Sequence, residues 1–174
     1  MKVAATLRVN GTDYPVELDP HATLLKAVRE ELGLTGSKEG CDDSECGACM
    51  MLLDGEPVNA CSYLALQAEG REVTTVEGLA GDEDVGPLQR AFLQQGGAQC
   101  GFCTPGMLVS ATALLRHNPH PTDEEIRIGL SGNLCRCTGY RGIVRAVRQA
   151  ADEDVPPLRT APVHPDPTPP HHAG

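Results

Sequence analysis

The sequence predicts an α+β protein in which a small sheet-containing domain is followed by a helical domain. Three observations support this prediction. The first 80 residues hold apolar runs joined by two-residue turn signals, the chain from residue 87 onward holds helix caps followed by apolar periodicity, and eight cysteines fall into two separate groups. At 174 residues the chain is long enough for two such domains, each with a limited core.

A hairpin and a helix are expected first. Residues 2–19 alternate around Asn10-Gly11, a pair that favours a two-residue turn because both positions need positive φ. Residues 23–32 place four aliphatic side chains on one helical face, and Gly33 follows where a left-handed residue would end the helix. The helix is therefore expected to pack on the sheet through this face. Its four side chains are Leu24, Leu25, Val28 and Leu32.

A second hairpin and one more strand complete the expected sheet. Residues 50–53 and 57–60 flank Asp54-Gly55, another two-residue turn signal. Residues 72–76 form a further short apolar run with β-branched side chains, which is typical of a strand.

The second half is expected to be a compact helical bundle. Thr104-Pro105 suggests an N-cap followed by proline at the first helical position, and Thr122 with Glu125 has the form of a capping box. The expected helices cover residues 87–94, 104–116, 123–130 and 140–151.

These patterns divide the chain. We expect a first domain at residues 1–79, a glycine-flanked acidic linker at 80–86 and a second domain at 87–154. Residues 155–174 contain half of the 14 prolines, so they are expected to be disordered or extended along a partner.

The net charge of -10 argues against nucleic acid and anionic membranes as partners, because neither phosphate backbones nor acidic lipids attract an acidic surface. No apolar run approaches the roughly 20 residues that span a bilayer, and the first residues lack the apolar core of a signal peptide. A cytoplasmic protein is expected. In a reducing compartment, metal ligation explains eight cysteines better than four disulfides do.

The first group of cysteines has the spacing C-x4-C-x2-C, with a fourth cysteine after eleven residues. This is the spacing of plant-type 2Fe-2S ferredoxins, whereas zinc sites usually show paired C-x2-C spacings. Glycines in and before the loop allow it to wrap closely around a cluster. The expected ligands are Cys41, Cys46, Cys49 and Cys61.

The second group leaves more alternatives open. A C-x2-C pair precedes a helix and a C-x-C pair follows another, so two helix-end loops could clasp one metal site, including a zinc site. A thioredoxin-like redox pair would need a strand-helix-strand setting, which the pattern does not provide. The candidate ligands are Cys100, Cys103, Cys135 and Cys137.

Three runs resemble one family. Residues 40–49 (GCDDSECGAC), 99–107 (QCGFCTPGM) and 132–140 (GNLCRCTGY) are similar to the small iron-sulfur subunits of the molybdenum hydroxylases, among them carbon monoxide dehydrogenase, xanthine dehydrogenase and aldehyde oxidoreductase. The resemblance covers about residues 3–152. Two departures from the family pattern are Ser44, where many xanthine dehydrogenase-like members have glycine, and Met50-Met51 in place of Thr-Val.

The resemblance implies a plant-ferredoxin-like β-grasp domain followed by a four-helix bundle, each holding one 2Fe-2S cluster. It also implies a hetero-oligomer with a large molybdopterin-binding subunit and an FAD-binding medium subunit. Gln99 and Cys137 fall where the family contacts the pterin. The implied function is electron transfer from a molybdopterin site to a flavin or another acceptor, without bond-making catalytic residues in this chain. A free-standing two-cluster ferredoxin and a zinc-stabilised interaction module are the alternatives.

Charge is distributed unevenly around the two groups of cysteines. Four acidic residues crowd the first cluster loop and four arginines crowd the end of the second. Carboxylates should lower the potential of a nearby cluster and arginines should raise it, so we expect a partner surface to neutralise the acidic residues. The residues concerned are Glu39, Asp42, Asp43 and Glu45 in the first group, and Arg136, Arg141, Arg145 and Arg148 in the second.

Overall fold

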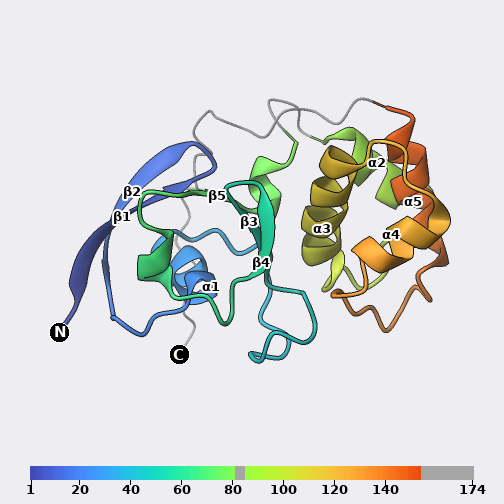
Figure 1. The fold of residues 1–174 in the computed structure, drawn as a ribbon. Helices are drawn as coiled ribbons and strands as arrows, with labels where there is room; N and C mark the ends of the chain where they lie inside the picture. Colours follow the sequence, from blue (N-terminus) through green and yellow to red (C-terminus); the bar gives the residue numbers. More distant parts are fainter. Residues whose placement is uncertain (81–84, 154–174) are drawn as a thin grey trace.

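The computed structural model describes residues 1–80 and 85–153 of the chain. Within these residues, five strands form one mixed sheet in the order β2-β1-β5-β3-β4, in which β1 and β5 run parallel and the other neighbours run antiparallel. Figure 1 shows the sheet in one half of the molecule and helices α2 to α5 in the other. The strands are β1 (Val3–Val9), β2 (Thr12–Leu18), β3 (Met50–Leu53), β4 (Glu56–Asn59) and β5 (Glu72–Thr74).

Both predicted hairpin turns are confirmed. Asn10 and Gly11 have φ of 49° and 77°, and Asp54 and Gly55 have φ of 52° and 91°. In each pair both residues are left-handed, as a two-residue turn of this kind requires. The predicted strand over 72–76 is shorter than expected, because a 3₁₀ turn, η3 (Val76–Gly78), begins before the strand could continue.

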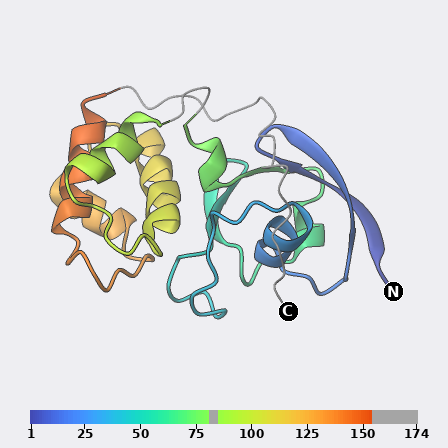
Figure 2. The same cartoon turned by 180° about the vertical axis from the view of Figure 1, so that it is seen from behind.

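The first helix lies where it was predicted but changes its winding. Thr23 caps α1 (Leu24–Lys26) by accepting a hydrogen bond from the Lys26 N–H at 3.2 Å. The chain then continues as a π-helix, η1 (Ala27–Glu31), before Gly33 turns left-handed with φ of 71°. All four predicted side chains are buried, and the helix lies against the strands, as the view from behind shows (Figure 2). A 3₁₀ turn, η2 (Ala65–Ala68), was not predicted.

The second half contains the four predicted helices: α2 (Pro87–Gln94), α3 (Thr104–His117), α4 (Asp123–Gly129) and α5 (Arg141–Ala151). The capping box at α4 is confirmed, since the Thr122 N–H donates to Glu125 Oε2 at 2.7 Å and the Glu125 N–H donates back to Thr122 Oγ1 at 3.3 Å. The N-cap predicted at Thr104 is wrong. Cys103 occupies the cap position two residues after the left-handed Gly101, with φ of +83°, and within the described residues the buried Thr104 hydroxyl has no hydrogen-bond partner.

Strand β3 separates two hydrophobic clusters. Met51 and Leu53 point into the cluster formed with α1 and β1, whereas Met50 and Leu52 point into the cluster formed with the helices of the second half. Successive side chains of a strand face opposite sides, so a strand covered on both faces must be apolar throughout. The Met50-Met51 pair meets this requirement, and α3 packs directly on β3 as a result.

The domain boundaries remain a prediction. The second hydrophobic cluster includes Leu79 and the two β3 side chains together with residues of all four helices, so the two halves share a packed interface. Residues 81–84 of the expected linker and the expected tail at 155–174 lie outside the described residues. Among the residues that are described, none of the helices has both the length and the apolar character that crossing a bilayer requires.

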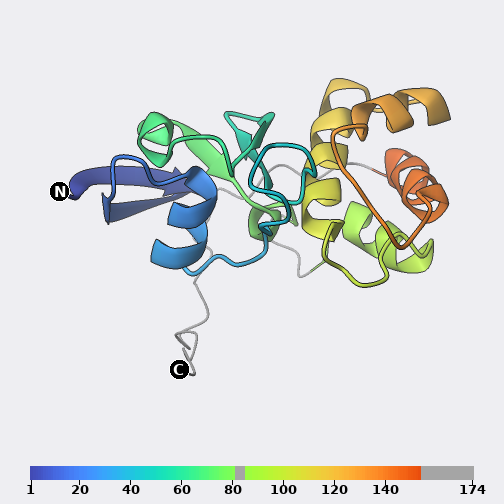
Figure 3. The same cartoon turned by 90° about the horizontal axis from the view of Figure 1, so that it is seen from below.

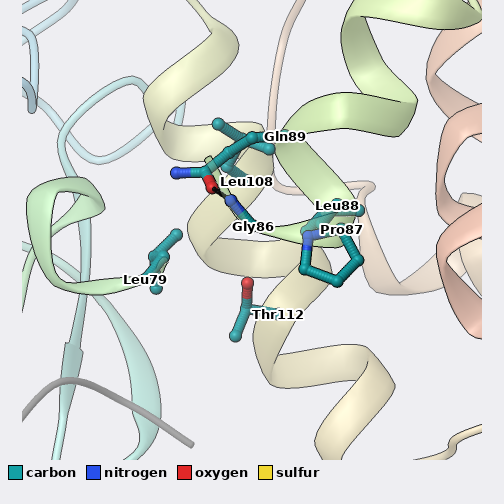
Figure 4. Close-up of a pocket in the computed structure, with 7 residues that line it drawn as sticks. All are labelled: Leu79, Gly86, Pro87, Leu88, Gln89, Leu108 and Thr112. Atoms are coloured by element: carbon teal, nitrogen blue, oxygen red, sulfur yellow. Dashed lines mark hydrogen bonds between the residues drawn. The ribbon is translucent and has the colours of Figure 1, made fainter. Parts of the chain in front are cut away.

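A small cavity of about 10 Å³ lies where the chain passes from the sheet to the helices (Figure 4). It is lined by Leu79, by the first turn of α2 and by Leu108 and Thr112 of α3, and the Gln89 side chain closes it by accepting the Gly86 N–H at 2.6 Å. A space of this size is at the lower limit for one water molecule.

Candidate metal centres

The first group of cysteines lies on a tightly wound loop between η1 and β3, with its fourth member just after β4. Cys41 and Cys46 are half-buried, whereas Cys49 and Cys61 are buried. Asp42, Ser44 and Gly47 have φ of 62°, 67° and 69°, so the loop reverses direction several times within one short stretch. The Cys46 N–H points at Cys41 Sγ at 3.3 Å, an amide-to-sulfur contact of the kind that stabilises a ligating thiolate.

The electrostatics of this group fit a metal. Burial raises the pKa of the Cys49 thiol to about 12 and also raises the pKa of Cys46. The Asp43 side chain raises the pKa of Cys41, but backbone N–H groups of Asp43 and Cys46 outweigh it, so that pKa is lowered overall. Buried thiols become thiolates when a bound cation takes the place of the proton. Three sulfur donors on one loop and a fourth just after β4 therefore suit a thiolate-bound metal centre.

The second group lies on the loop before α3 and the loop between α4 and α5. Cys100 and Cys137, one from each loop, are exposed, and their sulfurs lie 3.4 Å apart. Cys103 and Cys135 lie deeper and interact with each other. Burial raises the pKa of the Cys103 thiol to about 12. Thus all four candidate thiols of the second group come together, although two of them are more than 30 residues away from the other two in the sequence.

Within the described ranges, no three His, Cys, Asp or Glu side chains converge as ligands of a single metal ion. The sulfurs lie in neighbouring pairs instead. In a 2Fe-2S cluster four thiolates bind two irons, so pairs of neighbouring sulfurs can provide the ligands of such a cluster.

Cys135 is held by the turn that follows it. Its N–H donates to the Tyr140 hydroxyl at 2.8 Å, and its sulfur lies 3.1 Å from the Thr138 hydroxyl. Burial raises the pKa of this thiol, but the hydroxyl and backbone N–H of Thr138 outweigh burial, and the pKa is lower than usual. Sequence reasoning did not single out Thr138, although a hydroxyl three residues after a ligand is a local signal that could have found it.

The two groups of cysteines are in direct contact through their loops. The Leu134 N–H donates to the Cys46 carbonyl at 2.9 Å, and the buried Asn133 side chain donates to the Gly47 carbonyl at 3.1 Å. A Cβ on Gly47 would collide with the Gly132 carbonyl, and a Cβ on Gly106 in α3 would collide with the Gly47 carbonyl. Seen from below, the first loop lies against the start of α3 (Figure 3). Asn133 was not predicted as a contact residue, because its partner is 86 positions away.

The other expected site residues lie at the surface. Gln99 is exposed directly before Cys100, and Phe102 and Leu134 are large apolar side chains exposed beside the second group. Of the four arginines expected near this group, Arg148 forms an ion pair with Asp123 at 3.0 Å. Its charge is therefore partly neutralised inside the chain.

Comparisons with known proteins agree with this geometry. A family model described as a 2Fe-2S iron-sulfur cluster binding domain matches residues 7–80, and one described as a 2Fe-2S binding domain matches residues 75–148. The chain is thus a protein with two 2Fe-2S binding domains. The spacing of the second group of cysteines was also compatible with zinc, and this match favours iron.

Three similar proteins identify the family. The nicotinate dehydrogenase small FeS subunit of Eubacterium barkeri is 49% identical over 87% of this chain and 96% of that subunit. Quinoline 2-oxidoreductase from Pseudomonas putida 86 has a chain of similar structure, with a TM-score of 0.84 and 43% identity over 87% of this chain and 94% of that chain. Aldehyde oxidoreductase from Desulfovibrio gigas matches with a TM-score of 0.81 and 44% identity, over 86% of this chain but 17% of that one. The chain belongs to the molybdenum hydroxylase family, as one of its iron-sulfur subunits.

Proposed function

We propose that this chain relays single electrons from a molybdopterin site in a partner subunit, through two 2Fe-2S clusters, to a flavin or another acceptor. Cys100, Cys103, Cys135 and Cys137 would hold the cluster nearer the molybdopterin. Cys41, Cys46, Cys49 and Cys61 would hold the outer cluster. When bound, each cluster accepts and releases one electron, and the protein sets its potential through charge, hydrogen bonds and burial.

The observation that carries this proposal is the hydrogen bond between the Leu134 N–H and the Cys46 carbonyl at 2.9 Å. Leu134 precedes Cys135 in the chain, so one ligand of the second set is joined to one ligand of the first by a short run of covalent bonds and a single hydrogen bond. Asn133 and Gly47 hold the two loops at this contact. This contact supports a function in which the two sets of thiols would hold two electron acceptors beside each other.

We further infer that the sheet half is a ferredoxin-like β-grasp domain of residues 1–79 and that the helical half, residues 87–154, is a four-helix bundle. The mixed sheet with α1 on one face, and the four helices around one hydrophobic cluster, support these assignments.

The partners are proposed from surface exposure and from the relatives. Cys100, Cys137 and Gln99 are exposed together with Phe102 and Leu134, which suits a face covered by the molybdopterin subunit. The Eubacterium barkeri relative is called a small subunit, and the Desulfovibrio gigas chain includes a matching segment within a much longer protein. We propose a cytoplasmic hetero-oligomer with a large molybdopterin-binding subunit and an FAD-binding medium subunit.

Affinity purification of the tagged chain from its native cells tests the proposal. We expect larger chains with molybdenum to co-purify, about four irons per copy of this chain, and two distinct paramagnetic signals after reduction. A brown protein with two signals that purifies alone would instead be a free-standing ferredoxin. A colourless protein with zinc and no reducible iron would refute both.

A further inference from the structure

The turn after Cys135 contains a hydrogen-bond relay that ends on a ligand sulfur. The Tyr140 N–H donates to Thr138 Oγ1 at 3.2 Å, and Thr138 Oγ1 lies 3.1 Å from Cys135 Sγ. A hydroxyl that accepts from an amide keeps its own proton free for another acceptor. A thiolate bound to iron carries no proton, so in the loaded protein the Thr138 hydroxyl must be the donor.

The backbone keeps this hydroxyl in place. Gly139 and Tyr140 are both left-handed, with φ of 61° and 65°, which folds the chain back so that the Tyr140 N–H faces the threonine two residues earlier. The Tyr140 ring is half-buried against the core of the helical half, and its hydroxyl accepts the Cys135 N–H. A left-handed tyrosine is energetically unfavourable unless its surroundings enforce it. The turn is therefore held at both ends around Cys135.

The serine hydroxyls near the first group of cysteines bond to other oxygen atoms, whereas the Thr138 hydroxyl lies against a sulfur. Ser44 and Ser62 bond to each other through their hydroxyls, and Ser62 also donates to the Asn59 carbonyl at 3.3 Å. The polar side chains beside sulfurs of that group are the Asp43 carboxylate, next to Cys41, and the Asn59 amide, whose Oδ1 lies 3.9 Å from Cys49 Sγ. A donor stabilises the negative charge that a cluster gains on reduction, whereas a carboxylate opposes that charge.

From this geometry we infer that Thr138 is a tuning residue that raises the reduction potential of the Cys100/Cys103/Cys135/Cys137 cluster through its hydrogen bond to Cys135. The step concerned is a one-electron reduction in which the cluster gains one negative charge and the hydroxyl proton stays on oxygen. This inference rests on the proposed function, because it requires a cluster on these four thiolates.

The test is a dithionite titration of the holoprotein, monitored by paramagnetic resonance. The signal of the second cluster is first assigned in wild type by its loss in Cys103→Ser. In Thr138→Val, the second cluster should be harder to reduce. When the protein holds one electron, the ratio of reduced first cluster to reduced second cluster should rise by up to about tenfold, which corresponds to about 59 mV for a one-electron couple. Thr138→Ser keeps the hydroxyl and should recover most of the shift.

Two controls separate tuning from structural damage. The first cluster of the same molecule should keep its potential in every Thr138 variant. Thr112→Val removes a hydroxyl from a buried threonine on α3, whereas Thr138 itself is half-buried, and should leave both potentials unchanged. If Thr138→Val fails to load the second cluster, Thr138→Ala takes its place.

Three results would overturn the inference: an unchanged second potential in a valine or alanine variant that carries both clusters, a serine variant that shifts as far as valine, or failure of both valine and alanine variants to load the second cluster. A wild-type protein without two iron signals would contradict the proposed function itself, which distinguishes the two failures.

Discussion

Replacing Gly47 by alanine tests whether the contact between the two cysteine loops holds the molecule together. Gly47 is left-handed with φ of 69°, and a Cβ at this position would collide with the Gly132 carbonyl and lie 2.6 Å from Asn133 Nδ2. The left-handed backbone alone costs a non-glycine residue roughly 1–2 kcal/mol. The collision adds to this cost, because backbone of the opposite loop must move and the buried Asn133 hydrogen bond is lost, which costs about 1–3 kcal/mol more.

Gly33→Ala is the matched control for this substitution. Gly33 has nearly the same φ, 71°, but a Cβ there would meet nothing within 4 Å. Both variants therefore bear the backbone cost, and only Gly47→Ala separates the loops. We expect the apparent melting temperature of Gly47→Ala to fall below that of Gly33→Ala by roughly 2–12 °C, taking about 2–4 °C per kcal/mol for a chain of this size.

Far-ultraviolet circular dichroism at one scan rate, on anaerobic samples of equal iron content, measures this difference. Electron exchange between the clusters should also slow in Gly47→Ala, since the Leu134–Cys46 hydrogen bond spans the same contact. Equal melting temperatures for the two alanine variants would refute the reasoning, because they would mean that the loops do not touch in solution.

Three further predictions concern single sites. Cys103→Ser should remove one of the two reduced iron signals and about half of the iron while the other signal persists, as metal analysis and paramagnetic resonance would show. Ser44→Gly should leave stability equal or raise it by about 1 kcal/mol in denaturant unfolding, since φ of 67° strains serine; a clear loss would mean that the Ser62 contact outweighs the strain. Arg71, which donates to Asp54 at 2.6 Å, lowers the pKa of that exposed carboxyl. At pH values above 3.8, the ordinary aspartate pKa, this pair therefore stabilises the fold by no more than about 1 kcal/mol. The stabilisation disappears as the pH falls through the lowered pKa that Asp54 has in the folded protein. Asp54→Asn should lose this increment at neutral pH and match wild type in acid, and a difference independent of pH would contradict the assignment.

The features that the sequence predicted are local ones. The pairs Asn10-Gly11 and Asp54-Gly55 specify their turns because residue type alone permits positive φ at both positions. The capping box at Thr122 involves side chains only three residues apart. The spacing of the first cysteine group is equally local, and for this reason it could indicate the kind of cluster before the fold was known.

The features that the sequence did not predict depend on distant partners. The helix start at Thr104 was predicted correctly, but its cap is Cys103, and nothing in the residue pattern distinguishes Gly101, the left-handed glycine before it, from others in the loop. The sequence showed that β3 is apolar throughout, but it did not show why. The second face of β3 is covered by α3, which lies more than 50 residues further along the chain. The contact of Asn133 with Gly47 likewise joins two segments that lie on either side of the expected linker.

The contacts around the two groups of cysteines determine how charge acts on each cluster. The Asp43 side chain raises the pKa of the Cys41 thiol, so at least one acidic residue of the first loop acts on a candidate ligand. On the other side, the exposed ion pair with Asp123 partly neutralises Arg148, while the Thr138 hydroxyl lies 3.1 Å from the Cys135 sulfur. Hydrogen bonds at contact distance are less screened by solvent than exposed charges farther away. The difference in potential between the two clusters should therefore depend more on Asp43 and Thr138 than on the number of arginines. Covering the first loop with a partner would then chiefly change the effect of Asp43 on its cluster.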